Sequence, residues 1–229
     1  MRLLRSGQQR GRTTAPGLDG RSAFSSGDLH DPAWMGFGVL RACHEYRVAV
    51  GGRAPPPARA NMEILTFVLD GTLRDAHGDL HAPGVAWAGA GAGTELDGCL
   101  AAGDRTLHVL QAWIQPAHVN LPPVAARIAG TTTGDGWQLV AAPDGAGGAL
   151  PVRQQAWAWR GRVADGAALV FEMRVDRRYW MQVVGGALQC GAERLQAGDA
   201  LACYGEAGAL CVQAGSAAGG DVLLFDLPG

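Results

Sequence analysis

Lysine is absent from the 229-residue sequence, in which all 19 basic residues are arginine. Two explanations stay open: a compositional bias that also raises the alanine and glycine content, or binding of phosphate groups, which arginine contacts well. The formal net charge of −2 gives no general electrostatic reason to bind nucleic acid or an anionic membrane. We therefore expect neither of these as a partner.

Long apolar runs are also missing. No stretch approaches the roughly 18 apolar residues of a membrane-spanning helix, and Met1–Gly7 lacks the apolar core of a signal peptide. The apolar fraction of 48% and the charged fraction of 17% are typical of an ordered globular chain. We expect a soluble, cytoplasmic protein that is long enough for one large or two small domains.

The cysteines are odd in number and include no Cys-x-x-Cys pair. This spacing argues against a disulfide framework and against a zinc ribbon, so we expect most of them to be small core residues. The sequence also lacks a G-x-S-x-G elbow, a Walker loop and an H-E-x-x-H helix. The five cysteines are Cys43, Cys99, Cys190, Cys203 and Cys211.

Short runs of β-branched, aromatic and large apolar residues, separated by glycine turns, recur along the chain and predict an antiparallel all-β protein. The proline-containing, weakly periodic residues 116–136 are the expected linker between a domain at 1–115 and a domain at 137–229. The run Ala88–Gly93 superficially suggests a dinucleotide-binding loop. No apolar helix pattern follows it, however, so we set that reading aside.

A proline-stiffened segment, Ala54–Glu63, leads into an expected strand at Ile64–Leu69. Barrel enzymes that hold a metal place His-x-His at such an entry, because alternate residues of an extended chain point to the same side. The alternate positions here are Pro57 and Arg59. Proline has no side-chain donor and the guanidinium stays protonated, so neither can ligate a metal.

The same region carries a family resemblance. Asn61-Met-Glu-Ile-Leu-Thr-Phe-Val-Leu-Asp-Gly-Thr72 resembles the Asp-Met-Glu-Ile-x-Thr-Tyr-Val-Leu-Glu-Gly signature of the pirin family, two-barrel cupins that include bacterial pirin-like quercetin 2,3-dioxygenases. The other segments similar to the family, in the same order, are Ser22–Ser26 with Asp31–Arg41, Leu107–Ile114, Tyr179–Leu188 and Asp221–Pro228. The resemblance covers nearly the whole chain and implies two tandem cupin barrels of the jelly-roll (double-stranded β-helix) type.

In pirins, three imidazoles and one carboxylate hold iron or another divalent transition metal in the first barrel. The resemblance places these four positions at Pro57, Arg59, Leu96 and Gly98, with the third and fourth located by counting back from Leu107. None of the four side chains can donate to a metal, so the inherited centre cannot assemble. No cofactor is therefore predicted, and the second barrel, which lacks His-x-His, is expected to hold no metal.

The pocket of the first barrel is expected to survive, with Glu63, Gln111 and Trp113 beside the four former ligand positions. Gln111 and Trp113 alternate with Val109 on a strand, so they share a face and either line the pocket or pack in the core. Arg59 either points to solvent or turns inward, where it would pair with Glu63 and bind a small anion or carboxylate.

An alternative to the complete loss of the metal centre is a substitute metal site that combines Glu63 with a histidine. The histidines considered for it are His77, His81 and His108, each of which is otherwise a surface or hydrogen-bonded residue.

The leading hypothesis is a non-catalytic protein that binds a small molecule or acts as a regulator, with a protein partner as a further option. The alternative is a metal-dependent oxidoreductase of the quercetin 2,3-dioxygenase kind that uses the substitute site. A third interpretation is a structural or interaction module whose pocket is filled by its own side chains.

Overall fold

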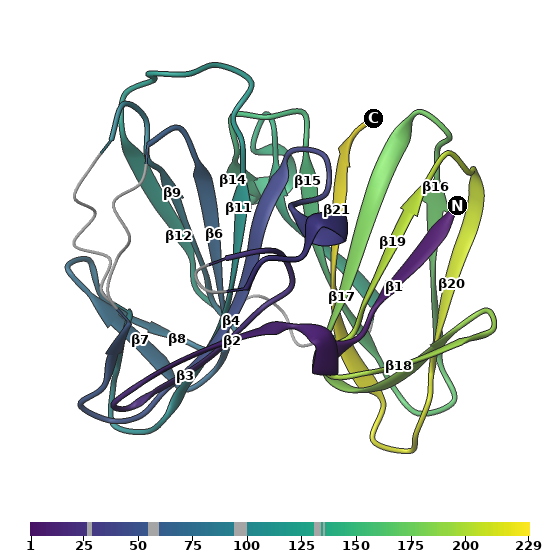
Figure 1. Ribbon diagram of the computed structural model, residues 1–229, viewed down its shortest axis with the longest axis horizontal. Coiled ribbons are helices and arrows are strands. Elements are labelled where there is room, and N and C mark those ends of the chain that lie inside the picture. Colours follow the sequence, from purple (N-terminus) through teal and green to yellow (C-terminus); the bar gives the residue numbers. More distant parts are fainter. Residues whose placement is uncertain (27–28, 55–59, 94–99, 131–133, 135) are drawn as a thin grey trace. The chain divides into compact units, whose positions relative to one another are not determined.

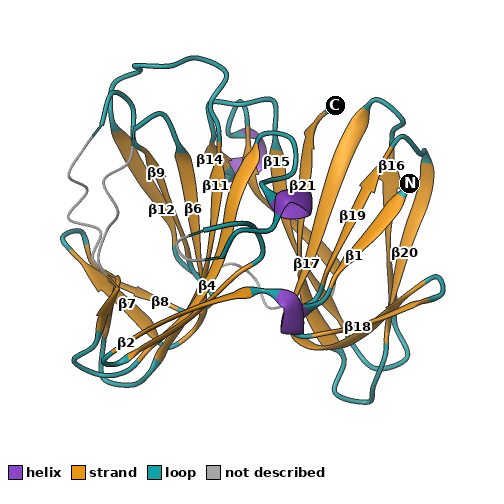
Figure 2. Ribbon diagram, viewed as in Figure 1, coloured by secondary structure: helices purple, strands orange, loops and turns teal. Residues whose placement is uncertain are grey.

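The computed structural model describes the chain except for residues 27–28, 55–59, 94–99, 131–133 and 135. The regular structure of the described residues is almost entirely β-strand, which confirms the all-β prediction (Figure 2). The only helices in this part of the chain are the 3-10 turns η1 (Gly7–Gln9), η2 (Pro32–Trp34) and η3 (Ala146–Gly148). In the described part of the chain, no helix has the length and apolarity needed to cross a membrane.

The chain forms two compact units. The first barrel consists of Gly11–Thr131 with Leu150–Gln154, and the second barrel consists of Met1–Arg10, Thr132–Ala149 and Gln155–Gly229.

The first barrel contains a seven-stranded antiparallel sheet and a four-stranded sheet (Figure 1). In spatial order the larger sheet is β12 (Val124–Ile128), β9 (Val85–Gly89), β6 (Glu63–Asp70), β11 (Leu107–Ile114), β4 (Leu40–Val48), β3 (Leu18–Ser22) and β2 (Gly11–Ala15). The smaller sheet is β5 (Arg53–Ala54), β10 (Leu100–Ala102), β7 (Thr72–Asp75) and β8 (Gly78–His81). Between the two sheets lies one apolar core, to which Val68 and Val109 of the larger sheet and Leu73 and Leu80 of the smaller sheet contribute.

The strands β6 and β11 occupy central positions of the larger sheet, and both are buried on both faces. Their sequences are accordingly continuous apolar runs rather than strict alternations of apolar and polar residues. Each face of these strands packs against protein, so even the few polar side chains they carry must find partners inside the molecule.

The second barrel is organised around β17 (Arg177–Cys190), a strand that shifts register near Val183 and Gly185 and pairs with four neighbours. Its main sheet runs β1 (Arg2–Arg5), β19 (Ala200–Tyr204), β17, β21 (Gly220–Pro228), β15 (Trp157–Val163) and β13 (Gly136–Ala142). The remaining strands of this barrel are β16 (Ala168–Met173), β18 (Glu193–Gln196) and β20 (Gly208–Ala214).

The observed units differ from the expected domain boundaries in three places. The strand β1 pairs with β19, so residues 1–10 belong to the second barrel (Figure 1). The expected linker 116–136 contains β12, an edge strand that pairs with β9. Leu150–Gln154, which includes β14 (Leu150–Pro151), belongs to the first barrel. These assignments depend on pairing with strands distant along the chain, which local sequence does not specify.

The four described cysteines are free thiols, and Cys43, Cys190 and Cys203 are buried as expected; Cys99 lies outside the described residues. Burial raises the pKa of the Cys203 thiol to about 12. At pH 8 its thiolate fraction is then roughly a thousandfold below that of an ordinary cysteine.

We expect iodoacetamide at pH 8 to alkylate Cys203 at least a hundredfold more slowly in the native protein than in urea, because both the thiolate fraction and access to the sulfur are low. Peptide mass spectrometry over a time course measures this, with the partly exposed Cys211 as the internal reference. Equal rates in the native and unfolded protein would contradict the burial of Cys203.

Candidate functional site

A polar and aromatic group lies on one face of the larger sheet of the first barrel. It consists of His44, Tyr46, Thr66, Gln111 and Trp113, and we call it the inner-face group. The strand β11 pairs Gln111 with both His44 of β4 and Thr66 of β6, and the adjacent pairs join Val109 to Tyr46 and Val68. Because Val68 and Val109 belong to the core between the two sheets, this is the face that points into the barrel.

The inner-face group is held together by side-chain contacts. Gln111 Nε2 donates to Thr66 Oγ1 at 3.0 Å, and both residues are buried. The His44 ring meets the Trp113 ring edge-on with centroids 5.2 Å apart, and it lies 5.8 Å from the Tyr46 ring. The group therefore combines aromatic surfaces with an amide, a hydroxyl and an imidazole.

The strand register places Gln111 and Trp113 on one face, as their alternation with Val109 predicts. Sequence analysis missed His44. A signal was present in the sequence, because His44 precedes Tyr46 and Val48 at intervals of two residues, and residues at this interval on a strand share a face.

Glu63 lies on the other face of β6. It shares its face with Leu65 and Phe67, whereas Thr66 points inward with Ile64 and Val68. The expectation that Glu63 lines one pocket together with Gln111 and Trp113 is therefore wrong. The error has a physical cause: both faces of β6 are buried, so apolar pattern alone does not show which one points into the barrel.

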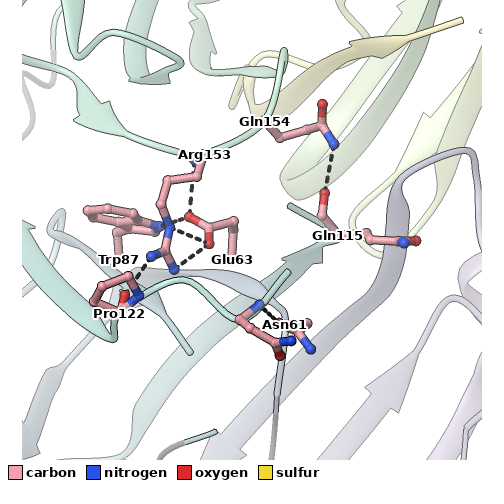
Figure 3. A network of polar contacts seen from close by, with 8 residues as sticks. Asn61, Glu63, Trp87, Gln115, Pro122, Arg153 and Gln154 are labelled. Carbon is pink, nitrogen blue, oxygen red and sulfur yellow. Dashed lines mark hydrogen bonds and ion pairs between the residues drawn. The ribbon is translucent and has the colours of Figure 1, made fainter. Parts of the chain in front are cut away.

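Glu63 is fully buried and its carboxylate is saturated with hydrogen bonds (Figure 3). Arg153 Nε and Nη2 donate to Oε1 at 2.9 and 2.8 Å, while Trp87 Nε1 and the Arg153 backbone N–H donate to Oε2 at 2.9 and 3.1 Å. The partner of Glu63 among the described residues is thus Arg153, 90 residues away along the chain. Arg59, the partner expected from the sequence, lies outside the described residues.

Other contacts fix Arg153 in place. Its Nη1 donates to the Pro122 carbonyl at 2.6 Å, and its guanidinium carbon lies 5.9 Å from the centroid of the Trp87 ring. Gly89 of β9 lies opposite Glu63 of β6. Its lack of a side chain makes room for the Arg153 guanidinium, because a Cβ at this position would collide with Arg153 Nη2. A carboxylate whose four acceptor positions are filled in this way is not available to a metal ion.

The histidines proposed for a substitute metal site are engaged elsewhere. His108 Nε2 lies 2.6 Å from Glu45 Oε1, on the face of β11 opposite Gln111. His81 Nδ1 lies 2.9 Å from Thr72 Oγ1 in the smaller sheet, and the exposed His77 occupies the turn before β8. Within the described ranges, no three His, Cys, Asp or Glu side chains are grouped so as to hold a metal.

The four positions that the family resemblance assigns to the pirin metal ligands, Pro57, Arg59, Leu96 and Gly98, lie outside the described residues. Their chemistry is set by the sequence alone: an imino-acid ring, a permanent cation, an aliphatic chain and a hydrogen. These residues do not fit the three-imidazole, one-carboxylate shell of a transition metal.

Two antiparallel sheet barrels in tandem define a two-barrel cupin. The family model described as "Quercetinase C-terminal cupin domain" matches residues 139–227. The chain is 31% identical over 233 residues to quercetin 2,3-dioxygenase of Escherichia coli (strain K12), covering 100% of this chain and 99% of that relative. It is also 28% identical over 192 residues to putative quercetin 2,3-dioxygenase PM1685 of Pasteurella multocida (strain Pm70), covering 81% and 82% of the two chains.

Solved structures give the same assignment. The crystal structure of YhhW from Escherichia coli matches with a TM-score of 0.88 and 29% identity, covering 100% of this chain and 98% of that one. A second crystal structure, of bacterial pirin YhhW in complex with nickel(II), matches equally well, with the same TM-score and identity and coverage of 100% and 99%. The chain belongs to the pirin family of two-barrel cupins.

Proposed function

We propose that this chain is a non-catalytic, cytoplasmic member of the pirin family that binds a small molecule in its first barrel without a metal cofactor. The observation that carries the proposal is the loss of donor chemistry at all four former ligand positions: Pro57, Arg59, Leu96 and Gly98. The hydrogen bonds that saturate Glu63 support it, because they occupy the carboxylate that was expected to take part in a substitute metal site.

The inner-face group suggests the class of ligand. Trp113 and His44 offer aromatic surfaces, while Gln111 and Thr66 offer donors and acceptors for hydroxyl groups. Several relatives bear the name quercetin 2,3-dioxygenase, and quercetin is a planar compound rich in hydroxyl groups. We propose a flavonol or a similar polyphenol as the ligand, with a regulatory protein partner responding to the bound state.

Metal content and quercetin turnover test the proposal together. We expect protein purified from its own host to contain less than about 0.1 equivalent of transition metal, because the side chains at the four assigned ligand positions supply no donor and the described residues contain no group of His, Cys, Asp and Glu that could hold a metal. Quercetin should bind in a calorimetric titration and remain unconsumed when oxygen is supplied. Near-stoichiometric iron, nickel, copper or manganese in elemental analysis, together with quercetin consumption, would contradict the proposal.

Replacing Gln111 by alanine is expected to weaken quercetin binding about tenfold, the effect of losing roughly one hydrogen bond to a ligand. The matched control is Gln189→Ala in the second barrel, where the amide donates only to the nearby Gly191 carbonyl. The titration should give wild-type affinity for this control. Equal affinities for wild type and Gln111→Ala would place the ligand away from the inner-face group.

A second candidate function is a metal-dependent quercetin 2,3-dioxygenase with a relocated site. The name of the relative that matches the whole chain favours it, and so does the inward position of His44. This candidate predicts quercetin turnover after metal is added, and loss of that turnover in His44→Ala.

A further inference from the structure

The second barrel contains a cavity of about 300 Å³ that is unrelated to the inner-face group. Its lining consists of Trp157, Trp159, Arg174, Asp176, Arg177 and Asp226. The volume lies at the lower end of the range for small-molecule sites, which suits a ligand of one ring.

Strand register shows how the cavity is built. The strand β21 places Asp226 opposite both Trp157 of β15 and Tyr179 of β17, and Trp159 pairs with Leu224. Tyr179 and Leu224 belong to the core of this barrel, so the cavity lies on the core face. It is at the end of the sheet where β15 and β17 begin and β21 ends. Figure 1 shows these three strands. Its walls are therefore made by three adjacent strands, which are more rigid than loops.

The remaining wall is the turn between β16 and β17, and it is also fixed. The Arg174 backbone N–H donates to the Tyr179 hydroxyl at 2.8 Å. Arg174 and Asp176 form a two-point ion pair, with Nε to Oδ1 at 3.1 Å and Nη2 to Oδ2 at 2.9 Å. Two arginines and two aspartates thus line the cavity and leave it without net charge.

The ion pair deeper in the cavity is only half used. Arg177 Nε donates to Asp226 Oδ1 at 2.6 Å, and Arg177 Nη2 donates to the Gln155 carbonyl at 3.0 Å. Within the described residues, Asp226 Oδ2 and Arg177 Nη1 make no hydrogen bond. The side chains of Arg177 and Asp226 are 12% and 18% exposed. Neither atom is among the fully buried side-chain nitrogen and oxygen atoms that lack a partner, so both reach solvent and can bond to a ligand.

Aromatic rings lie beside the Arg177–Asp226 pair. The Arg177 guanidinium carbon lies 4.7 Å from the centroid of the Trp157 ring, and Trp159 packs edge-on against Phe171 with centroids 5.7 Å apart. Burial raises the pKa of Asp226 above its usual value, even though the hydrogen bond from Arg177 acts in the opposite direction. The unused acceptor and donor therefore belong to one ion pair that lies beside indole rings.

We propose that this cavity binds a small neutral ring with neighbouring hydroxyl groups, such as a monosaccharide or a simple catechol. One hydroxyl would donate to Asp226 Oδ2 while its neighbour accepts from Arg177 Nη1, and the ring would pack against the indoles. A charged ligand suits the cavity less well. An anion would compete with Asp226 for Arg177 and a cation would compete with Arg177 for Asp226, so either one would leave a partly buried charge unpaired.

The test is calorimetric titration of the full chain with D-glucose, D-galactose and catechol, with acetate and tetramethylammonium as charged probes. We expect at least one hydroxylated ring to bind with a dissociation constant on the order of 1 mM, as expected of a ligand of this size. Comparing the titrations with sugars and with catechol shows which kind of hydroxylated ring the cavity binds. Binding of none of the three rings up to about 20 mM, or binding of the charged probes alone, would overturn the proposal.

Substitutions of cavity residues test whether the ring binds in this cavity. Asp226→Asn and Trp157→Ala should each weaken it at least tenfold, while Trp157→Phe, which keeps an aromatic wall, should retain most of it. The matched control is Asp221→Asn, because Asp221 lies on the same strand and pairs with Arg162 outside the cavity. Unchanged affinity in both Asp226→Asn and Trp157→Ala would overturn the assignment. Only residues of the second barrel take part, so the outcome is independent of quercetin binding in the first barrel.

Discussion

Replacing Glu63 by alanine is expected to lower the free energy of unfolding of the first barrel by about 3–5 kcal/mol. The carboxylate is fully buried and accepts four hydrogen bonds. Its removal leaves the Arg153 guanidinium, only 20% exposed, without its counter-charge, and leaves the Trp87 N–H without its acceptor. Breaking one side of such a pair costs more than the pair itself contributes, because the remaining charge stays buried.

Urea unfolding followed by circular dichroism measures the loss. Arg105→Ala is the matched control, since Arg105 and Asp70 form an ion pair in the same barrel with both side chains about 60% exposed. We expect less than about 1 kcal/mol for this control. The double variant Glu63→Leu with Arg153→Met should recover most of the loss, because it leaves no charge uncompensated. A loss below about 1 kcal/mol for Glu63→Ala would show that Arg153 finds an equivalent partner or water.

Placing the family's four ligand residues at positions 57, 59, 96 and 98 is expected to create a metal site. The change is the quadruple variant Pro57→His, Arg59→His, Leu96→His and Gly98→Glu, which reinstates the three imidazoles and one carboxylate of the pirin family. Nickel(II) is the natural probe, because a solved relative with a TM-score of 0.88 is a complex with nickel(II). We expect the variant to bind about one equivalent, since neutral imidazole and carboxylate donors satisfy a divalent ion.

Equilibrium dialysis followed by elemental analysis measures the metal content of the wild type and the variant. The control carries alanine at the same four positions, so it removes Pro57 and Arg59 without adding donors. We expect it to behave as the wild type does. If the quadruple variant folds, as judged by circular dichroism, and still binds no nickel, the assignment of the four positions to the family's ligands is wrong. If the wild type already binds one equivalent, the proposed function fails.

The positions of side chains on the two faces of the larger sheet show what a local sequence pattern can predict. Alternation along β11 correctly grouped Gln111 and Trp113 with Val109, because side chains in a strand alternate with period two whatever surrounds them. The same rule does not say which face is the inside when both are buried. That is why Glu63 was expected in the pocket, although it lies behind the sheet with Arg153.

No local feature of the sequence predicts that Arg153 pairs with Glu63. The residue follows β14, far from β6 along the chain, and nothing in its neighbours distinguishes it from the other arginines. The cavity of the second barrel was missed for the same reason. Trp157, Arg177 and Asp226 come from three separate strands, and only their pairing brings the indole, the guanidinium and the carboxylate together.

The sequence by itself determined the all-β class, the membership in a family of two-barrel cupins and the absence of metal donors at four defined positions, because these depend on composition, local period and residue identity. Only the tertiary structure decided which barrel residues 1–10 join, which face of β6 is the interior and which arginine neutralises Glu63. These features depend on contacts between segments tens of residues apart, and such contacts are set by the packing of whole sheets rather than by the pattern within one strand.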